Sequence, residues 1–351
     1  MSDLKLATIE RIVDIFPHPD PEVERLEIAK VLNFTCVVSK GAFKVGDLCI
    51  LIQPDSVLPD AEWTEPYKKF CKTRVRATKI RQFISFGIVE KYSLYEHYLK
   101  LDRQKHEDFC KDSLLPNQYF WDNRIGADVT DLLGITKYET PAPQDLQAKG
   151  NLPYQIPKTD ENNWQGIRNL DKYLGKTVDI SLKCDGSSTS FYYKDGAFGC
   201  LSRNLEIKPE CENKYTHHIT KLNLYTKLAS YCETHKVNIC LRGESYGTGI
   251  QNLKNNPHSK LPLNIAFYSV WLIDEMRYAG KGEKHYFVDV CKDLGLPTVD
   301  ILEENVKLTY ELIKKYDEQL DKVNGQPFEG VVVKGADFSF KIINKHYDSK
   351  K

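Results

Sequence analysis

The sequence lacks several features that would announce a particular class of protein. It has no apolar run near the roughly 18 residues that a membrane-spanning helix needs. Its first residues, which include Asp3 and Glu10, lack the apolar centre of a signal peptide. The 10 cysteines form no C-x-x-C pair, which argues against a zinc ribbon and a secreted disulfide scaffold. We therefore expect an intracellular protein, cytoplasmic or nuclear, with reduced thiols and no membrane partner.

The sequence also lacks an excess of charge of either sign. Lysine and arginine together number 49, as do aspartate and glutamate, so the formal net charge is zero. Overall charge consequently does not announce a nucleic-acid partner, and any basic surface must be local. No coiled-coil pattern indicates an assembly, so we expect a monomer.

The pattern along the 351 residues predicts two domains. Residues 1–135 contain short alternating strands separated by Gly and Pro, which is typical of a small β-barrel. Within them, residues 93–125 are less regular and are predicted to be an insertion with some helix. Residues 136–157 are rich in proline and are predicted to be a linker. Residues 158–351 mix helical and strand patterns, which predicts an α/β domain.

The densest cationic stretch of the chain lies in the predicted barrel. If it forms a strand, Arg74 and Arg76 share one face of that strand. Such a face is either a charged edge that prevents aggregation or a surface that follows a phosphate backbone. The candidate RNA-binding residues are Arg74, Arg76, Lys79 and Arg81.

The most informative stretch is residues 180–186, where an alternating strand pattern ends in the residues KCDG. Lys183 ends the strand, and Asp185 follows on the same side if the chain stays extended. A lysine amine is nucleophilic only when neutral, and its ordinary pKa of about 10.4 leaves it charged at pH 7. Nearby cations or burial are expected to lower that pKa. Alone, the tetrapeptide is more often a surface turn in which Gly supplies a positive φ.

Other charged residues lie at or near the ends of predicted strands. Glu244 ends a strand over residues 237–244, and Glu329 lies near the start of residues 328–334. Each carboxylate adjoins a glycine. Taken singly, each would be a salt-bridged turn residue, but with Lys183, Arg203 and Lys341 they form an ordered set that indicates phosphate chemistry.

These motifs resemble those of the covalent nucleotidyltransferase superfamily, which includes ATP-dependent ligases and mRNA capping enzymes. The resemblance rests on residues 183–186 (KCDG), 202–204 (SRN), 242–244 (RGE), 329–334 (EGVVVK) and 340–341 (FK). The continuation GESYGTGIQ at residues 243–251 is closer to RNA ligases than to DNA ligases. In the first half, PHPD, KVGD, PDSVLP and GITKYE, which begin at residues 17, 44, 54 and 134, resemble RNA ligases of the Naegleria/Deinococcus type.

The resemblance implies an α+β fold with an N-terminal OB-fold β-barrel. The barrel would precede a mixed α/β nucleotidyltransferase domain with antiparallel sheets, the ATP-grasp-like fold of ligases and capping enzymes. It implies an enzyme that uses ATP and Mg²⁺ or Mn²⁺ to join 3′-OH and 5′-phosphate RNA ends or nicks, as in RNA repair. Lys183 would be the nucleophile that becomes linked to AMP. Asp185, Glu244 and Glu329 would hold the metal ion through water.

The resemblance also implies contacts with the nucleotide. Arg203, Lys334 and Lys341 would contact phosphate or ribose, and the Leu182 carbonyl would read the adenine amino group. The family's adenine-stacking aromatic residue is replaced by Val270, which we favour as the contact, with Phe267 as the alternative. The place of a second lysine in the last motif holds Ile343, so either Lys345 substitutes for that lysine or Lys341 acts alone. Lys158 or Arg168 would take the role of an upstream arginine on the outer phosphates.

Two other interpretations remain open at this point. A DNA ligase or a GTP-using guanylyltransferase would share the motifs, but most of them place the OB fold after the catalytic domain. An RNA-binding protein with an inactive transferase domain would explain the missing second lysine. The presence of the nucleophile and all three carboxylates argues against that loss of activity.

Overall fold

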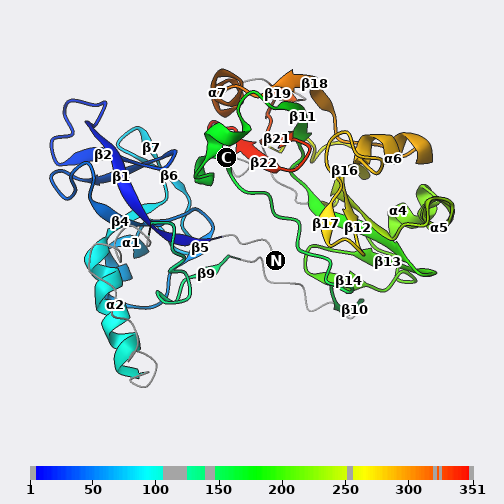
Figure 1. Ribbon diagram of the computed structural model, residues 1–351, viewed down its shortest axis with the longest axis horizontal. Helices are drawn as coiled ribbons and strands as arrows, with labels where there is room; N and C mark the ends of the chain where they lie inside the picture. Colours follow the sequence, from blue (N-terminus) through cyan, green and yellow to red (C-terminus); the bar gives the residue numbers. More distant parts are fainter. Residues whose placement is uncertain are drawn as a thin grey trace. The chain divides into compact units, whose positions relative to one another are not determined.

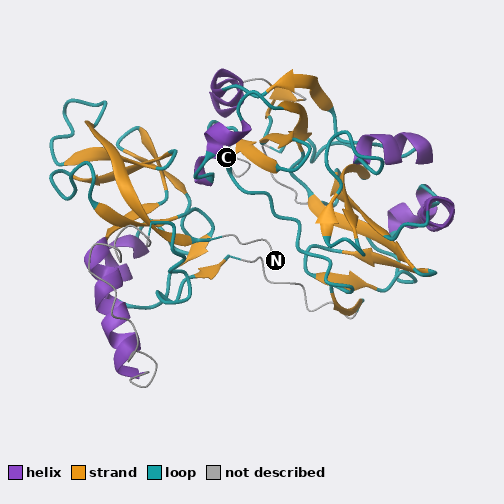
Figure 2. Cartoon of the chain, in the orientation of Figure 1, coloured by secondary structure: helices purple, strands orange, loops and turns teal. Residues whose placement is uncertain are grey.

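The computed structural model describes residues 5–105, 125–138, 147–250, 256–318, 322–323 and 326–347. They form two compact units: residues 5–138 with 165–168, and residues 147–164 with 169–347. Strands dominate both units and helices are few (Figures 1 and 2). The predicted α+β fold with antiparallel sheets is confirmed, and the described residues contain more strand than helix. None of the described helices is long and apolar enough to cross a membrane.

The first unit is built on a five-stranded antiparallel sheet with the order β3-β2-β1-β4-β8. Its strands are β1 (Ala7–Pro17), β2 (Leu26–Val31), β3 (Phe34–Ser39), β4 (Leu48–Ile52) and β8 (Ile88–Lys91). Two small pairs, two helices and a 3₁₀ turn complete it: β5 (Ser56–Val57) with β9 (Thr136–Lys137), β6 (Ala77–Ile80) with β7 (Phe83–Phe86), α1 (Glu65–Lys68), α2 (Tyr92–Lys105) and Glu62–Thr64.

The sheet of the first unit curves into a half-barrel because β1 pairs with two different strands along its length. The first half of β1 pairs with β4 and the second half with β2, and the register shifts between Ile12 and Asp14. Such a bulge bends a strand and increases its twist. Strand β4 is apolar on both faces: Ile50 contributes to one buried cluster and Leu51 to another.

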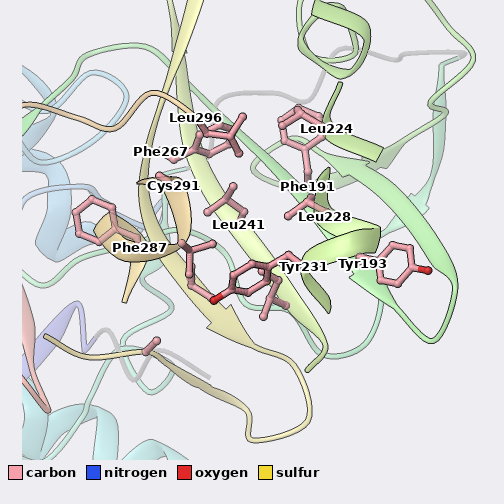
Figure 3. Close-up of a cluster of buried hydrophobic side chains, with 14 of the residues drawn as sticks. Phe191, Tyr193, Leu224, Leu228, Tyr231, Leu241, Phe267, Phe287, Cys291 and Leu296 are labelled. Carbon is pink, nitrogen blue, oxygen red and sulfur yellow. The ribbon is translucent and has the colours of Figure 1, made fainter. Parts of the chain in front are cut away.

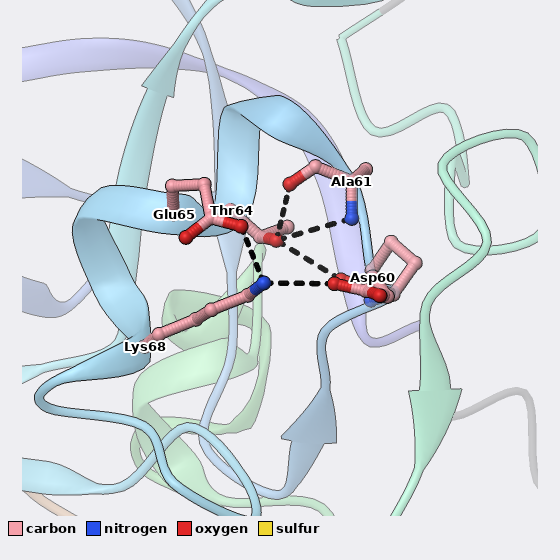
Figure 4. A network of polar contacts seen from close by, with 6 residues as sticks. Asp60, Ala61, Thr64, Glu65 and Lys68 are labelled. Carbon is pink, nitrogen blue, oxygen red and sulfur yellow. Dashed lines mark hydrogen bonds and ion pairs between the residues drawn. The ribbon is translucent and has the colours of Figure 1, made fainter.

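A network of polar contacts fixes the turn into α1 (Figure 4). The Thr64 hydroxyl donates to the carbonyl oxygens of Ala61, at 2.7 Å, and of Pro59, at 3.0 Å. Lys68 Nζ lies 2.8 Å from Asp60 Oδ1 and also pairs with Glu65. These ion pairs are exposed, so they define the local shape of the turn more than the stability of the unit.

The second unit contains two antiparallel sheets. The larger has the order β10-β14-β13-β12-β15-β16-β17, and the smaller has the order β18-β11-β21-β22. The larger sheet comprises β10 (Ala148–Asn151), β12 (Ser187–Lys194), β13 (Ala197–Leu201), β14 (Leu205–Ile207), β15 (Ile239–Tyr246), β16 (Asn264–Leu272) and β17 (Arg277–Tyr278). The smaller comprises β11 (Thr177–Lys183), β18 (Ile301–Lys307), β21 (Gly330–Lys334) and β22 (Ser339–Ile343). A separate pair joins β19 (Lys322–Val323) and β20 (Gln326–Pro327).

Helices α4, α5 and α6 cover one face of the larger sheet, whereas α7 packs against β21 and β22 of the smaller sheet (Figure 1). Leu228 of α5 and Phe287 of α6 pack with Phe191 and Phe267 of the sheet in the main hydrophobic core, as Figure 3 shows. The opposite face carries a smaller apolar cluster around Tyr192 and polar side chains beyond it. The helices and 3₁₀ turns are α4 (His217–Lys221), α5 (Leu224–His235), α6 (Phe287–Leu294), α7 (Tyr310–Glu318), Trp164–Gly166 and Leu170–Tyr173.

The segments predicted as insertion and linker contain regular structure where they are described. Helix α2 fills the first part of residues 93–125, and residues 106–124 lie outside the described part of the chain. Within residues 136–157, β9 pairs with β5 and β10 pairs with β14. Residues 139–146 between these two strands lie outside the described part.

Candidate active site

Strand pairing brings Lys183 against Glu329. Lys183 is the last residue of β11 and lies opposite Gly330, the first residue of β21. The Lys183 Nζ is 2.6 Å from Oε1 of Glu329, the residue before the strand. Gly330 has a φ of +154°, and a Cβ there would lie 2.1 Å from the carbonyl oxygen of Ile342. The glycine therefore lets β21 approach β22 and hold Glu329 at the lysine.

Strand β11 is buried on both faces, which differs from its alternating sequence. The polar residues Asp179 and Ser181 are 4% and 1% exposed. Asp179 accepts from Lys281 at 2.6 Å, and the Ser181 hydroxyl donates to the Val332 carbonyl at 3.2 Å. Because distant segments supply hydrogen-bond partners for these side chains, burying this polar face costs little free energy.

Gly186 connects Asp185 to Glu244. The Gly186 backbone N–H donates to the Glu244 carboxylate. A Cβ at Gly186 would lie 2.3 Å from the Ser245 carbonyl oxygen and 2.9 Å from Glu244 Cγ. Gly186 is not among the glycines with positive φ, so close approach, and not turn geometry, explains this glycine.

Asp185 is held at both its side chain and its backbone. The Tyr347 hydroxyl donates to Asp185 Oδ2 at 2.6 Å, and the Asn256 amide donates to the Asp185 carbonyl at 2.8 Å. Both partners come from segments distant in the sequence, and neither was identified by the sequence analysis. They fix Asp185 beside the lysine, which is the placement that the motif predicted.

The carboxylates control the protonation of the site. Burial alone would lower the pKa of Lys183, but the ion pair with Glu329, with contributions from Glu244 and Asp185, raises it above its ordinary value. The sequence analysis expected a lowered pKa for Lys183. That expectation is wrong for the protein side chains without a bound ligand, because the three carboxylates raise the pKa by more than burial lowers it. Burial raises the pKa of Glu244 to about 8 and also raises that of Glu329, while Lys183 opposes both shifts.

The donor set suits a hard divalent cation bound through water. Glu329 Oε2 is buried and has no hydrogen-bond partner, which is unusual for a carboxylate oxygen. Within the described residues, no three His, Cys, Asp or Glu side chains are grouped closely enough to hold an ion directly. Mg²⁺ typically binds one or two carboxylates and keeps several water molecules, so Asp185, Glu244 and Glu329 fit such an ion.

The strand registers place the predicted cations of the smaller sheet on the same face as Lys183. Val332 lies opposite both Ser181 and Lys341, and Lys334 lies opposite Ser339. Directly paired residues share a face of a sheet. Lys334 Nζ is nearly buried and donates to Ser269 Oγ of the larger sheet at 2.8 Å. On the larger sheet, Arg203 pairs with Asp160 at 3.0 Å.

The residues predicted to contact adenine lie in the hydrophobic interior. Phe267 and Val270 are both fully buried in the core against the helices, and Figure 3 shows Phe267 there. Leu182 is 4% exposed, and its N–H donates to the Asp300 carbonyl at 2.8 Å. Nothing in this placement presents Phe267 or Val270 to a ligand.

Tyr268 is a candidate that the sequence analysis missed. The register of β15 and β16 shifts so that Gly243 pairs with Phe267 while Arg242 pairs with Ser269. The intervening Tyr268 is half-buried, and its phenol is close enough to Glu244 and Arg242 to interact electrostatically with both. Lys334 Nζ lies 5.8 Å from the centre of its ring. A two-residue shift of the motif from Val270 would have identified it, but nothing in the sequence shows the bulge at this place in β16.

In the first unit, the cationic stretch divides into two groups. Arg74 and Arg76 precede β6, so the prediction that they share a strand face is wrong. Arg74 is held by Asp55, at 3.1 Å, and by the ring of Tyr138, at 4.3 Å. The side chains that remain exposed are those of Arg76, Lys79 and Arg81.

The substitutes proposed for missing family residues have structural partners. Arg168 binds the buried Glu10 through both terminal nitrogens, at 2.6 and 2.9 Å. Lys345 Nζ pairs with Glu318 at 2.7 Å. These contacts give Arg168 and Lys345 structural roles, in place of the phosphate contacts that the sequence analysis considered for them.

Comparison with protein families gives two matches. Residues 176–343 match the RNA ligase family, and residues 6–91 match an OB-fold domain. The two matched segments contain the candidate active site and the half-barrel, respectively. No curated protein sequence matches the chain.

Solved structures of the Naegleria gruberi RNA ligase are similar over nearly the whole chain. A single-residue mutant of that ligase with ATP and Mn is 27% identical, with a TM-score of 0.76 and coverage of 98% of each chain. The same ligase with PPi is 27% identical, with a TM-score of 0.77 and coverage of 98% of this chain and 97% of that one. Another mutant with AMP and Mn is 25% identical, with a TM-score of 0.76 and coverage of 98% of each.

Proposed function

We propose that this chain is an ATP-dependent RNA ligase that seals 3′-OH and 5′-phosphate ends. In its sequence, an RNA ligase domain follows an OB-fold domain. The similar Naegleria structures hold ATP with Mn, AMP with Mn, or PPi, which are the reactants and products of an adenylylation step. The contact between Lys183 and Glu329 is the observation that supports the proposal most directly, because the amine that we propose as the nucleophile lies beside a carboxylate and also interacts with Glu244 and Asp185.

Lys183 is the group that receives AMP. Its neutral amine attacks the α-phosphate of ATP, forming a bond between nitrogen and phosphorus while the bond to the pyrophosphate oxygen breaks. The AMP then passes to the 5′-phosphate of RNA, and the attack of a 3′-OH releases it. Phosphoryl transfer of this kind depends mainly on positioning and on charge neutralisation.

Asp185, Glu244 and Glu329 are the residues that would hold a divalent cation, Mg²⁺ or Mn²⁺. When bound, the cation neutralises phosphate charge and favours the loss of the Lys183 proton, because it offsets the three carboxylates that raise this pKa. Glu329 contacts the lysine directly and therefore couples occupation of the cation site to the charge of the nucleophile.

The remaining polar residues of the site orient the nucleotide. Lys341 and Lys334 share the face of Lys183 and contact phosphate or ribose, and Arg203 does so from the larger sheet. Tyr268 replaces Val270 and Phe267 as the proposed adenine contact, because its ring borders the polar residues of the site while theirs are in the core. The Leu182 carbonyl remains the proposed acceptor for the adenine amino group.

The OB-fold unit contributes RNA binding. Arg76, Lys79 and Arg81 are exposed within six residues, around β6 and the turn that follows it, and are suited to phosphate contacts. Arg74 is a support for this surface, since Asp55 and Tyr138 already hold it. We propose a protein that acts inside the cell as a monomer.

A nick-sealing assay tests the end chemistry. The substrate is a duplex RNA with one nick that carries a 3′-OH and a 5′-phosphate, and matched nicks carry a 5′-OH or a 3′-phosphate. The proposal predicts joining of the first substrate alone, and joining of RNA in preference to an all-DNA nick. Equal joining of the DNA nick would favour a DNA ligase, and joining of a 5′-OH nick would contradict the mechanism.

A further inference from the structure

One segment of the second unit, residues 157–163, connects the two sheets beside the candidate active site. We call it the crossing segment. At its start it binds the larger sheet: the Pro157 carbonyl accepts from Arg242, and the Thr159 hydroxyl donates to Ser188 Oγ at 2.8 Å. At its end it binds the smaller sheet, because the Asn162 carbonyl accepts from the backbone N–H of Lys341 at 2.8 Å.

Glu161 lies in the crossing segment where the two sheets exchange side-chain contacts. Its Oε1 accepts from Lys334 Nζ at 3.0 Å and from Ser339 Oγ at 2.9 Å. Lys334 also donates to Ser269 Oγ, at 2.8 Å. One ammonium group is thus held by a carboxylate from the crossing segment and a hydroxyl from the larger sheet.

The side chain of Lys334 needs such partners. It is only 6% exposed, so water cannot replace a missing partner. A lysine carries a point charge on a flexible four-carbon stem, and its ammonium position is set by the groups that bind it. Removing one partner of a buried ion pair leaves an uncompensated charge, which is strongly unfavourable. Glu161, together with Ser269, therefore holds the Lys334 ammonium in position.

The position of Lys334 links it to the reaction. Its register places it on the same face of the smaller sheet as Lys183 and Lys341. We propose that Glu161 is a positioning residue for the transfer of AMP to Lys183 and that it acts through Lys334. The inference rests on the proposed function, since it requires that Lys334 contacts the nucleotide. Glu161 itself holds the lysine and takes no part in bond making.

A double-mutant cycle on the full chain tests this inference. The variants are Glu161→Gln, Lys334→Gln and the double substitution, and the measurement is the rate of AMP attachment to Lys183 in a single turnover as ATP is varied. Glu161→Gln is expected to lower this rate by about tenfold or more, as losses of groups that orient a ligand do. The double variant is expected to be no slower than Lys334→Gln, because Glu161 has no effect once its lysine is gone.

Ser339→Ala is the matched control. It removes the other hydrogen bond to Glu161 and leaves Lys334 in place, so its rate is expected to match the unmodified protein. Glu161→Asp keeps the charge with a shorter side chain and is expected to fall between the unmodified protein and Glu161→Gln. All rates are taken below the unfolding temperature of the least stable variant, so that a loss of fold is not read as a loss of positioning.

The possible outcomes test the positioning role of Glu161 separately from the proposed ligase function. If the unmodified protein forms the adduct but Glu161→Gln matches its rate, the positioning role is overturned and the proposed function stands. If the two single effects multiply in the double variant, Glu161 acts independently of Lys334 and the inference is also overturned. If the unmodified protein forms no adduct with ATP and Mg²⁺ or Mn²⁺, the proposed function fails and the inference fails with it.

Discussion

The Nζ of Lys183 lies 2.6 Å from Oε1 of Glu329, although 146 residues separate them in the sequence. The pair keeps the lysine charged, as the raised pKa of its amine indicates. Oε2 of the same glutamate is buried without a hydrogen-bond partner. One carboxylate thus restrains the nucleophile and also offers an oxygen to a cation, so cation binding and nucleophile release involve the same group.

The first prediction concerns Glu329. Glu329→Gln removes the charge and keeps the shape, and it is expected to lower the rate of AMP attachment by about 100-fold or more, as the loss of one electrostatic contact to a transition state does. Glu318→Gln is the control, since Glu318 pairs with a lysine on an exposed surface. Time-resolved mass spectrometry measures the rate of AMP attachment in both variants. An equal loss of rate in the two variants would contradict a special role for Glu329.

The second prediction concerns Gly186. Gly186→Ala places a Cβ 2.3 Å from the Ser245 carbonyl oxygen. Separating these segments is expected to lower the free energy of unfolding by about 1–3 kcal/mol and to slow AMP attachment, because the Gly186 N–H also binds Glu244. Gly150→Ala is the control, since a Cβ there meets nothing within 4 Å. Urea denaturation of both variants measures the effect; a similar loss in each would refute the close-approach explanation.

The third prediction concerns pH. Burial, with smaller repulsions from His217 and Lys221, lowers the pKa of His218 from 6.5 to about 4. Between these values the unfolded chain binds more protons than the folded one, so stability falls as pH falls. From pH 7 to pH 5 the free energy of unfolding is expected to drop by about 2 kcal/mol through this residue. The loss of stability is fully developed below the folded pKa.

Two variants separate this effect from general acid sensitivity. His218→Asn is expected to reduce the dependence of unfolding free energy on pH between 7 and 5, whatever its effect at pH 7. His217→Asn changes the exposed neighbour in the same helix and is expected to weaken the dependence much less than His218→Asn does, because His217 contributes only a repulsion smaller than the effect of burial. Urea denaturation at both pH values provides the comparison. Unchanged pH dependence in His218→Asn would disprove the assignment.

The fourth prediction concerns the OB-fold unit. Replacing Arg76, Lys79 and Arg81 with serine is expected to weaken RNA binding and sealing while AMP attachment stays normal. If each contacts one phosphate, the slope of log affinity against log salt falls by about 3. Filter binding across a salt series measures this slope. The control removes the same charge from the unit at the exposed Arg25, Lys40 and Lys44, and an equal effect of both triple variants would place the RNA elsewhere.

The sequence predicted the fold class and the core of the candidate site well because both depend on local patterns. Alternation located most strands: Lys183 ends β11, Glu329 directly precedes β21, and Glu244 lies near the end of β15. Antiparallel pairing of β11 with β21 brings Lys183 to Glu329. Glu244 comes from the larger sheet and meets this region through the N–H of Gly186, a contact between sheets that strand order alone does not predict.

The remainder of the site depends on relationships that a single sequence does not display. The bulge between β15 and β16 turns Tyr268 toward the polar residues and leaves Val270 in the core. The crossing segment supplies Glu161, and its partners are more than 100 residues away. Arg74 looked like part of a charged strand, but its contacts with Asp55 and Tyr138 give it a structural role. The protonation of Lys183 depends on the balance of burial against three carboxylates, which only their positions reveal.

The most direct test of the account is the intact mass of the purified protein after incubation with ATP and Mg²⁺ or Mn²⁺ in the absence of nucleic acid. The protein is first treated with pyrophosphate to remove any AMP already attached, and Lys183→Ala is measured beside it. The account predicts an added mass of one AMP that is absent in Lys183→Ala. A folded protein that gains no mass, or a Lys183→Ala variant that gains the same mass, would contradict the assignment of Lys183 as the adenylylated nucleophile.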